Sequence, residues 1–130
     1  MVERYARKEM SEKWSLQAKY DAWLKVELAA VKAWNKLGLI SDCDKDKILQ
    51  NASFRIERID EIEKTTKHDV IAFLTSVSES LGQESRFVHY GMTSSDCIDT
   101  AVALQIKESM ELIIEDVQNL KAAIKSQAMK

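Results

Sequence analysis

The sequence predicts an all-α protein: a helical N-terminal domain followed by the first long helix of a truncated central helix bundle. The 130 residues include three glycines and no proline, the two residue types that most often interrupt helices. Hydrophobic residues make up 45% and charged residues 31%, a balance typical of amphipathic helices around one core. Apolar residues also recur at helical spacing. We expect the N-terminal domain over residues 1–93 and the long helix over residues 94–130.

Residues 1–10 are polar and have no helical period, so we expect a frayed terminus. Ser11 is expected to cap a first helix that stops at Gly38, a residue type suited to the position after a helix end. Short helices are expected over residues 42–50 and 54–63. The positions expected to face the core in these segments are Leu16, Tyr20, Leu24, Leu28, Val31, Phe54, Ile59 and Ile62.

The pattern Thr66-x-x-Asp69 resembles a helix cap and precedes an apolar run that ends near residues 81–82. Residues 67–69 should therefore lie at the start of a helix. The last helix should begin at Ser94 or Ser95. At 1.5 Å per residue it would be roughly 50 Å long, so we expect it to project from its own domain. Its apolar seam, typical of a bundle, consists of Ile98, Val102, Ile106, Ile113, Val117, Leu120 and Ile124.

The segment 86–96, RFVHYGMTSSD, fits no helical period but runs directly into this last helix. Thr93-x-x-Asp96 is the pattern of a capping box. The first turn of a helix has unpaired N–H groups and a partial positive charge, which suit a carboxylate or a phosphate. We therefore expect a binding site here. His89 has two equal interpretations: it contacts the ligand, or it only holds the turn at Gly91.

Net charge, hydropathy and cysteine content limit the kinds of partner and compartment that the chain can have. The net charge is −2 and no basic block stands out, so we expect no nucleic-acid or membrane partner. No apolar run approaches membrane-spanning length, and the first ten residues lack the apolar core of a signal peptide. Cys43 and Cys97 form no CxxC pair and no disulfide framework, which indicates reduced thiols. These features predict a cytoplasmic protein.

Three segments together resemble one family: ERY at residues 3–5, TKHDV at residues 66–70 and HYGMTSSD at residues 89–96. In this order they are similar to the N-terminal region of adenylosuccinate lyases, in the fumarase/aspartase superfamily, and the resemblance covers the whole chain. A carboxymuconate cycloisomerase has a similar His-x-Gly-x-Thr-Ser segment, but the first two segments favour the lyase.

The resemblance implies β-elimination of fumarate from adenylosuccinate, giving AMP, and from the succinyl-carboxamide ribotide SAICAR, giving AICAR, in purine biosynthesis. It also implies a homotetramer without metal or organic cofactor. The general acid and general base would lie outside these 130 residues, so no catalytic residue is expected here beyond an auxiliary role for His68. The substrate-binding residues implied are Arg4 and Tyr5 for the nucleotide phosphate, Lys67, His68 and Asp69 along the site, and Thr93 and Ser94 for the succinyl group. The hydroxyl of Ser95 is a further candidate.

Two other interpretations remain. In a helical interaction module, the last helix would dock a partner and the helix-start residues would be ordinary caps. A metal site on His68 and His89 with a carboxylate is disfavoured, because their spacing matches no common metal-binding pattern.

Overall fold

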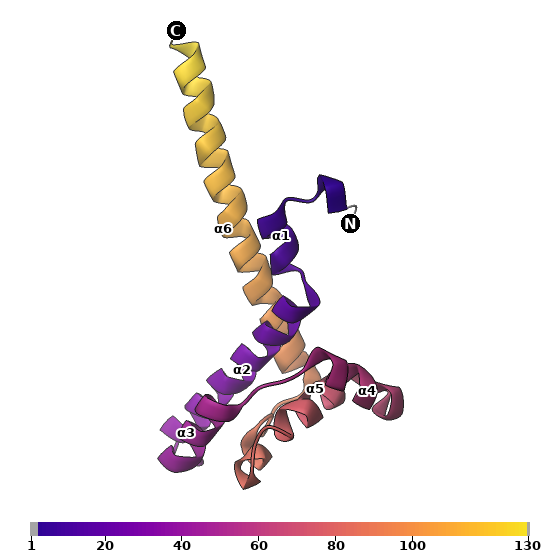
Figure 1. Ribbon diagram of the computed structural model, residues 1–130. Coiled ribbons are helices and arrows are strands. Elements are labelled where there is room, and N and C mark those ends of the chain that lie inside the picture. The colour runs from indigo at the N-terminus through magenta and orange to yellow at the C-terminus, as the bar shows by residue number, and fades with distance from the viewer. Residues whose placement is uncertain (1–2, 130) are drawn as a thin grey trace.

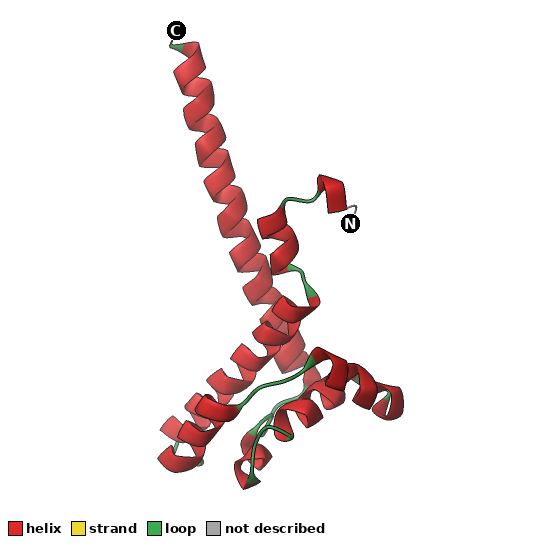
Figure 2. Ribbon diagram, in the orientation of Figure 1, coloured by secondary structure: helices red, strands yellow, loops and turns green. Residues whose placement is uncertain are grey.

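The computed structural model describes residues 3–129, which form helices and no strand (Figures 1 and 2). The predicted all-α class is confirmed. Six α-helices and two short 3₁₀ helices, η1 and η2, follow one another in the described chain. Their bounds are η1 Glu3–Tyr5, α1 Lys8–Lys13, α2 Leu16–Lys36, α3 Asp42–Asn51, α4 Ile56–Thr66, α5 Asp69–Ser78, η2 Gln83–Phe87 and α6 Ser94–Ala128.

The N-terminal part corrects two predictions. Residues 3–10 hold η1 and the start of α1, so the prediction of a frayed terminus was wrong there, and residues 1–2 lie outside the described chain. The first predicted helix is divided in two, with Ser11 inside α1 and Trp14 outside helical geometry at φ −111° and ψ 15°. The division occurs because Ser15 caps α2, accepting a hydrogen bond from the Ala18 N–H at 3.1 Å.

The middle helices follow the prediction with small shifts. Gly38 ends the α2 turn at φ +76°, and Ser41 caps α3 by accepting from the Asp44 N–H at 3.0 Å. Helix α4 starts at Ile56, and Phe54 packs against the core from the segment before it. Helix α5 ends at Ser78, earlier than predicted, and η2 was not predicted at all.

Aromatic residues of α2 and α5 form the centre of the core. The rings of Tyr20 and Phe73 stack at 5.7 Å with an interplanar angle of 5°, and Trp23 meets Phe73 edge-on at 5.4 Å. Such pairs add about 0.5–1.5 kcal/mol each beyond burial. From α6, the small residues Cys97 and Ala101 complete this cluster and let the helix approach closely. The starts of α5 and α6 are therefore fixed relative to α2.

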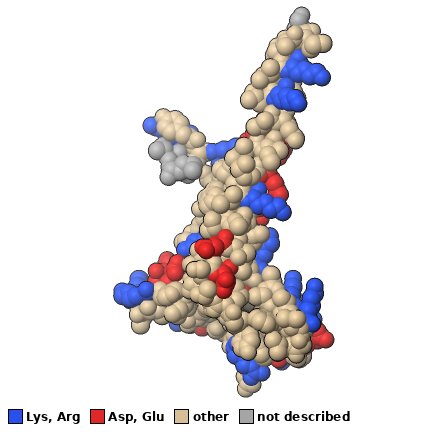
Figure 3. Space-filling view, turned by 180° about the vertical axis from the view of Figure 1, so that it is seen from behind, with Lys and Arg blue, Asp and Glu red and all other residues tan. Residues whose placement is uncertain are grey.

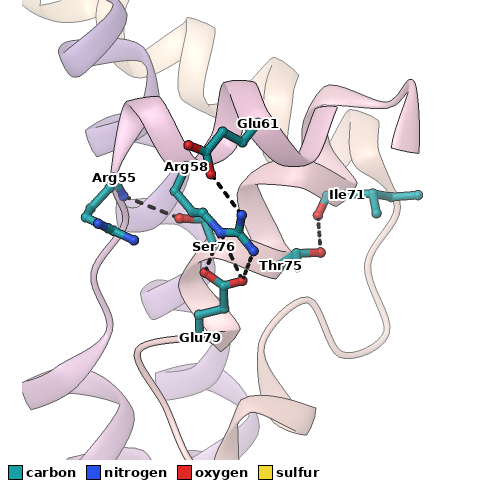
Figure 4. A network of polar contacts seen from close by, with 7 residues as sticks. All are labelled: Arg55, Arg58, Glu61, Ile71, Thr75, Ser76 and Glu79. Carbon is teal, nitrogen blue, oxygen red and sulfur yellow. Dashed lines mark hydrogen bonds and ion pairs between the residues drawn. The ribbon is translucent and has the colours of Figure 1, made fainter. Parts of the chain in front are cut away.

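A surface network links α4 to α5 (Figure 4). The Arg58 guanidinium donates to Glu79 through Nη2 at 2.7 Å and Nε at 3.0 Å, and to Glu61 at 2.9 Å. These bonds raise the pKa of Arg58 and lower that of Glu79. Ser76 accepts from the Arg55 N–H at 3.3 Å. Because the ion pairs are exposed, we expect them to contribute little to stability.

Helix α6 has two different halves. In the first half, the buried residues recur one turn apart and are Cys97, Ala101, Gln105 and Ser109. Gln105 donates to the Lys13 carbonyl at 2.8 Å and so ties α1 to α6. Beyond Leu112 every described residue is exposed, and the helix projects as a rod whose face in Figure 3 is largely uncharged. Its large apolar side chains, 44–61% exposed, are Ile113, Ile114, Val117, Leu120 and Ile124.

Candidate functional site

Helix α2 contacts the start of α5, the start of α6 and the turn that precedes α6. Three of its residues, spaced four apart, make these contacts from one face of the helix. At 1.5 Å per residue, the three contact points span about 12 Å. The pairs are Lys19 with Asp69 at the start of α5, Trp23 with Cys97 at the start of α6, and Glu27 with His89 in the turn.

The start of α5 differs from the predicted capping pattern. Lys67 adopts the left-handed conformation, with φ +52°, and ends α4, so Thr66 belongs to the last turn of α4. His68 is the N-cap of α5 in extended geometry. The prediction that Thr66 caps this helix was therefore wrong: its hydroxyl donates to the His68 carbonyl at 3.3 Å instead.

The polar contacts at this start are few, and those of His68 are exposed. Asp69 accepts from the Val70 N–H at 2.8 Å, and its other oxygen lies 3.7 Å from Lys19 Nζ. His68 Nδ1 lies 3.5 Å from the Ile71 N–H and 3.7 Å from Asp69 Oδ1. The first contact needs a lone pair on Nδ1 and the second needs a proton there, so only one forms at a time. The imidazole is free to adapt to a ligand.

The start of α6 has the geometry expected of an anion-binding site. Asp96 accepts from the Thr93 N–H at 2.8 Å, which forms the carboxylate half of the predicted capping box. Ser94 and Ser95 are the first two residues of the helix, positions whose N–H groups have no acceptor within it. Thr93 and Ser95 are exposed and Ser94 is half-buried. Hydroxyls and N–H groups are thus offered together where the helix dipole favours negative charge.

The turn before α6 is rigid. His89 and Gly91 both have positive φ, at +63° and +71°, and the Met92 N–H donates to the His89 carbonyl at 3.2 Å. Trp34 donates from Nε1 to the Tyr90 carbonyl at 2.8 Å and meets its ring edge-on. A Cβ on Gly91 would lie 3.0 Å from Trp34 Cζ2, so both conformation and space require glycine here.

Glu27 is a residue of this region that the sequence analysis missed. Its side chain is completely buried; Oε1 lies 2.7 Å from His89 Nδ1, and Oε2 accepts the His89 N–H at 2.8 Å. The available signal was its helical spacing, one turn after Trp23 and one before Val31 on the buried stripe. Burial raises the pKa of Cys97 to about 12, and the negative charge of Glu27 contributes. The Cys97 thiol therefore stays protonated at neutral pH.

Arg4 and Tyr5 lie apart from the two helix starts. They belong to η1, beside α1 in Figure 1, where the Arg4 guanidinium carbon sits 4.8 Å from the centre of the Tyr5 ring. Tyr5 is 77% exposed. Over residues 3–129, no hydrogen bond or ion pair joins either residue to Lys67–Asp69 or to Thr93–Ser95. The structure thus gathers the α5 start, the α6 start and His89 along α2, but not η1.

Two further observations concern the surface. A hollow of about 750 Å³ between α1, α2 and α6 is lined mostly by charged side chains, including the pair Lys13–Glu108 at 2.8 Å, and by none of the predicted site residues. Within the described range, no three His, Cys, Asp or Glu side chains gather as metal ligands would. No described helix is both long and apolar enough to cross a membrane.

Comparison with known proteins decides the family. A family model described as lyase matches residues 3–130. The chain belongs to this lyase family. It is 58% identical over all 130 residues to the adenylosuccinate lyases of Helicobacter pylori strains 26695 and J99, which confirms the predicted resemblance. The chain spans 30% of the length of each of these lyases.

A solved lyase structure supports the fold. The fumarate lyase from Mesorhizobium sp. BNC1 superposes with a TM-score of 0.79 over 87% of this chain and 27% of that one. At 24% identity this likeness concerns the fold alone.

Proposed function

We propose that the chain forms the substrate-binding N-terminal part of an adenylosuccinate lyase. The enzyme would release fumarate from adenylosuccinate to give AMP, and from SAICAR to give AICAR, in purine biosynthesis. The observation that carries this proposal is the alignment of two open helix starts along one face of α2. The 58% identity to adenylosuccinate lyases supports the choice of reaction.

The start of α6 would hold the succinyl end of the substrate. Thr93 and Ser94, with Ser95 as a further candidate, offer hydroxyls and N–H groups to its carboxylates. Elimination begins with loss of a proton beside a carboxylate, and the resulting negative charge spreads onto the carboxylate oxygens. Donors already aimed at those oxygens stabilise the transition state, and one such donor can contribute about 3 kcal/mol.

The start of α5 would meet the nucleotide end. Lys67 is an exposed cation, and His68 can turn its ring toward a phosphate or ribose because its own contacts are weak. Asp69 would accept from a ribose hydroxyl or orient His68. Arg4 and Tyr5 would bind the phosphate, since a guanidinium offers paired planar donors. Their separation from both helix starts fits a site completed by more than one subunit.

The general acid and general base of the complete enzyme would lie in the part that the chain does not span. His68 would have only an auxiliary role in catalysis, and we expect no metal or organic cofactor. The chain alone would then bind substrate without converting it.

Assembly into a homotetramer is the second part of the proposal. The apolar stripe of α6 from Ile113 to Ile124 is exposed in the single chain, and neighbouring helices of the assembled enzyme would cover it. The two cysteines, Cys43 and Cys97, are unpaired, which fits a reducing compartment such as the cytoplasm.

A chimera tests the function. The 130 residues replace the matching part of a Helicobacter pylori adenylosuccinate lyase, and fumarate release is followed in the ultraviolet. We expect the chimera to turn over adenylosuccinate, and Ser94→Ala to lower kcat/KM about 100-fold. Ser41→Ala removes a serine hydroxyl from a helix start that has no predicted site residue; it serves as the control and should leave kcat/KM unchanged. Equal kinetics for Ser94→Ala and the parent chimera would refute the site.

A further inference from the structure

The buried carboxylate of Glu27 needs an explanation beyond packing. Both of its oxygens bind one residue, His89, at 2.7 and 2.8 Å. Burying a carboxylate costs several kcal/mol, which short charge-assisted bonds offset but seldom exceed. An apolar side chain of similar size would fill this position between Trp23 and Val31 without that cost. What Glu27 adds is a fixed position for His89, because it grips the backbone N–H and the imidazole together.

The two bonds from Glu27 determine which way the imidazole of His89 faces. When Nδ1 donates to the carboxylate, Nε2 is the nitrogen left for another partner. Among the side chains of residues 4–129, no buried nitrogen or oxygen lacks a hydrogen-bond partner, and none of them bonds Nε2. Nε2 is therefore at the surface, although the His89 side chain is only 18% exposed.

The backbone of His89 supports a specific role. Its φ of +63° is a left-handed conformation that costs a non-glycine residue about 1–2 kcal/mol. Strain of this kind concentrates where a side chain must be aimed. The Glu27 oxygen that accepts the His89 N–H stabilises this conformation. His89 is also joined to the α6 start by the Met92 turn, so its ring belongs to the same rigid unit as Thr93 and Ser94.

We propose that Glu27 is a positioning residue of the site. It holds His89 with Nδ1 inward and Nε2 outward, facing the anionic group that binds at the start of α6. This inference rests on the proposed function for the identity of that anion. The positioning itself concerns only this chain and can be tested without turnover.

Histidine spectroscopy on the full 130-residue chain tests the positioning. Because there are only two histidines, labelling both with ¹³C and ¹⁵N gives one signal set for His89 and one for the exposed His68. We expect His89 to carry its proton on Nδ1 and Glu27→Leu to abolish that preference. The His68 signals should stay unchanged, which would show that the variant is folded. Asp21→Asn, on the exposed side of the same helix, should leave both histidines as they are. An Nε2–H form of His89 in the unmodified chain would overturn the proposal.

A second variant covers the case in which Glu27→Leu does not fold. Glu27→Gln keeps the shape but gives an amide whose oxygen accepts from one of the two donors and whose nitrogen repels the other. Either the backbone N–H signal or the ring signal of His89 must then shift. His89 signals identical to those of the unmodified chain would overturn the positioning role.

Kinetics of the chimera test whether Glu27 acts through His89. We expect Glu27→Gln and His89→Gln each to lower kcat/KM at least about tenfold, the effect of one lost charge-assisted bond. The double variant should be no worse than His89→Gln alone, whereas additive losses would overturn the proposal. If the unmodified chimera releases no fumarate, the proposed function fails, and the histidine spectra decide the positioning by themselves.

Discussion

The two helix starts on α2 are built differently. At the start of α5, Asp69 accepts a local bond from the Val70 N–H at 2.8 Å, but the other contacts of His68 and Asp69, including the one with Lys19, are long, at 3.5–3.7 Å. At the start of α6, the preceding turn is held by the buried Glu27 on His89 and by the half-buried Trp34 on Tyr90, at 2.7–2.8 Å. Both starts offer donors to an anion, but only the second is fixed before a ligand arrives.

This difference matches the two tasks of the proposed reaction. Donors that stabilise a transition state must be in place beforehand, because reorganising them would cost the energy that they supply. Donors that only bind the unreactive end of a substrate can close around it. The rigid α6 start would thus suit the succinyl end, where bonds change, and the open α5 start the nucleotide end.

The largest expected effect concerns the rigid turn. Gly91→Ala should lower the free energy of unfolding by about 3 kcal/mol, because the methyl group adds a left-handed penalty and a 3.0 Å contact with Trp34. Gly38→Ala is the matched control: φ is similar, at +76°, but the space around it is open. It should cost only the backbone penalty, about 1–2 kcal/mol. Equal losses in urea unfolding would mean that Trp34 does not confine the turn.

Alkaline pH should lower the stability of the chain through Cys97, at the start of α6. The pKa of Cys97 is raised to about 12 in the folded chain, from 9.0 for an ordinary thiol. Above pH 9 the unfolded chain loses this proton and the folded chain keeps it, so stability is full below pH 9 and falls toward pH 12. We expect a loss approaching about 1.4 kcal/mol per pH unit. Cys97→Ala removes this contribution, and an identical slope for both proteins in unfolding curves at pH 9–10.5 would contradict the burial of the thiol.

Loss of a cap should affect the two starts unequally. Asp96→Ala removes the 2.8 Å bond to the Thr93 N–H and should cost about 1 kcal/mol of stability. His68→Ala removes a long 3.5 Å contact and should change stability by less than about 0.5 kcal/mol. Thermal unfolding of the two variants side by side measures the difference. A larger loss for His68→Ala would reverse our distinction between the rigid and the open start.

A small effect, dependent on salt, is expected at Lys19. Its ammonium lies 3.7 Å from Asp69 and 4.5 Å from the centre of a Trp23 ring, at the surface. Lys19→Met should cost less than about 1 kcal/mol in dilute buffer, and the Asp69 part of that loss should shrink as salt is added. A salt-independent loss would show that Lys19 acts by packing on Trp23 and not by charge.

Local sequence signals predicted much of this molecule. Helical periodicity and the absence of proline predicted the helices, Gly38 predicted the end of α2, and Thr93-x-x-Asp96 predicted the start of α6. The errors arose where short-range rules compete. Ser11 and Ser15 are both suitable N-cap residues, and only Ser15 takes that role. Thr66 also resembles an N-cap, but Lys67 ends α4 in the left-handed conformation, so the N-cap of α5 is His68.

Contacts between residues far apart in the sequence could not be predicted from local patterns. The bond between Glu27 and His89 joins positions 62 apart, and no local pattern marks either residue as its partner. The same holds for the alignment of both helix starts on α2, which follows from packing of Tyr20, Trp23 and Phe73 in three dimensions. The roles of the site residues, and the division at residues 93 and 94, stay predictions.

Product inhibition of the chimera tests the division of labour between the two starts most directly. Inhibition constants for fumarate and for AMP are measured with Ser94→Ala and with Lys67→Ala. We expect Ser94→Ala to weaken fumarate inhibition about tenfold or more and to leave AMP inhibition unchanged, and Lys67→Ala to do the reverse. If both products weaken together in either variant, or neither changes, the two helix starts do not hold separate ends of one substrate.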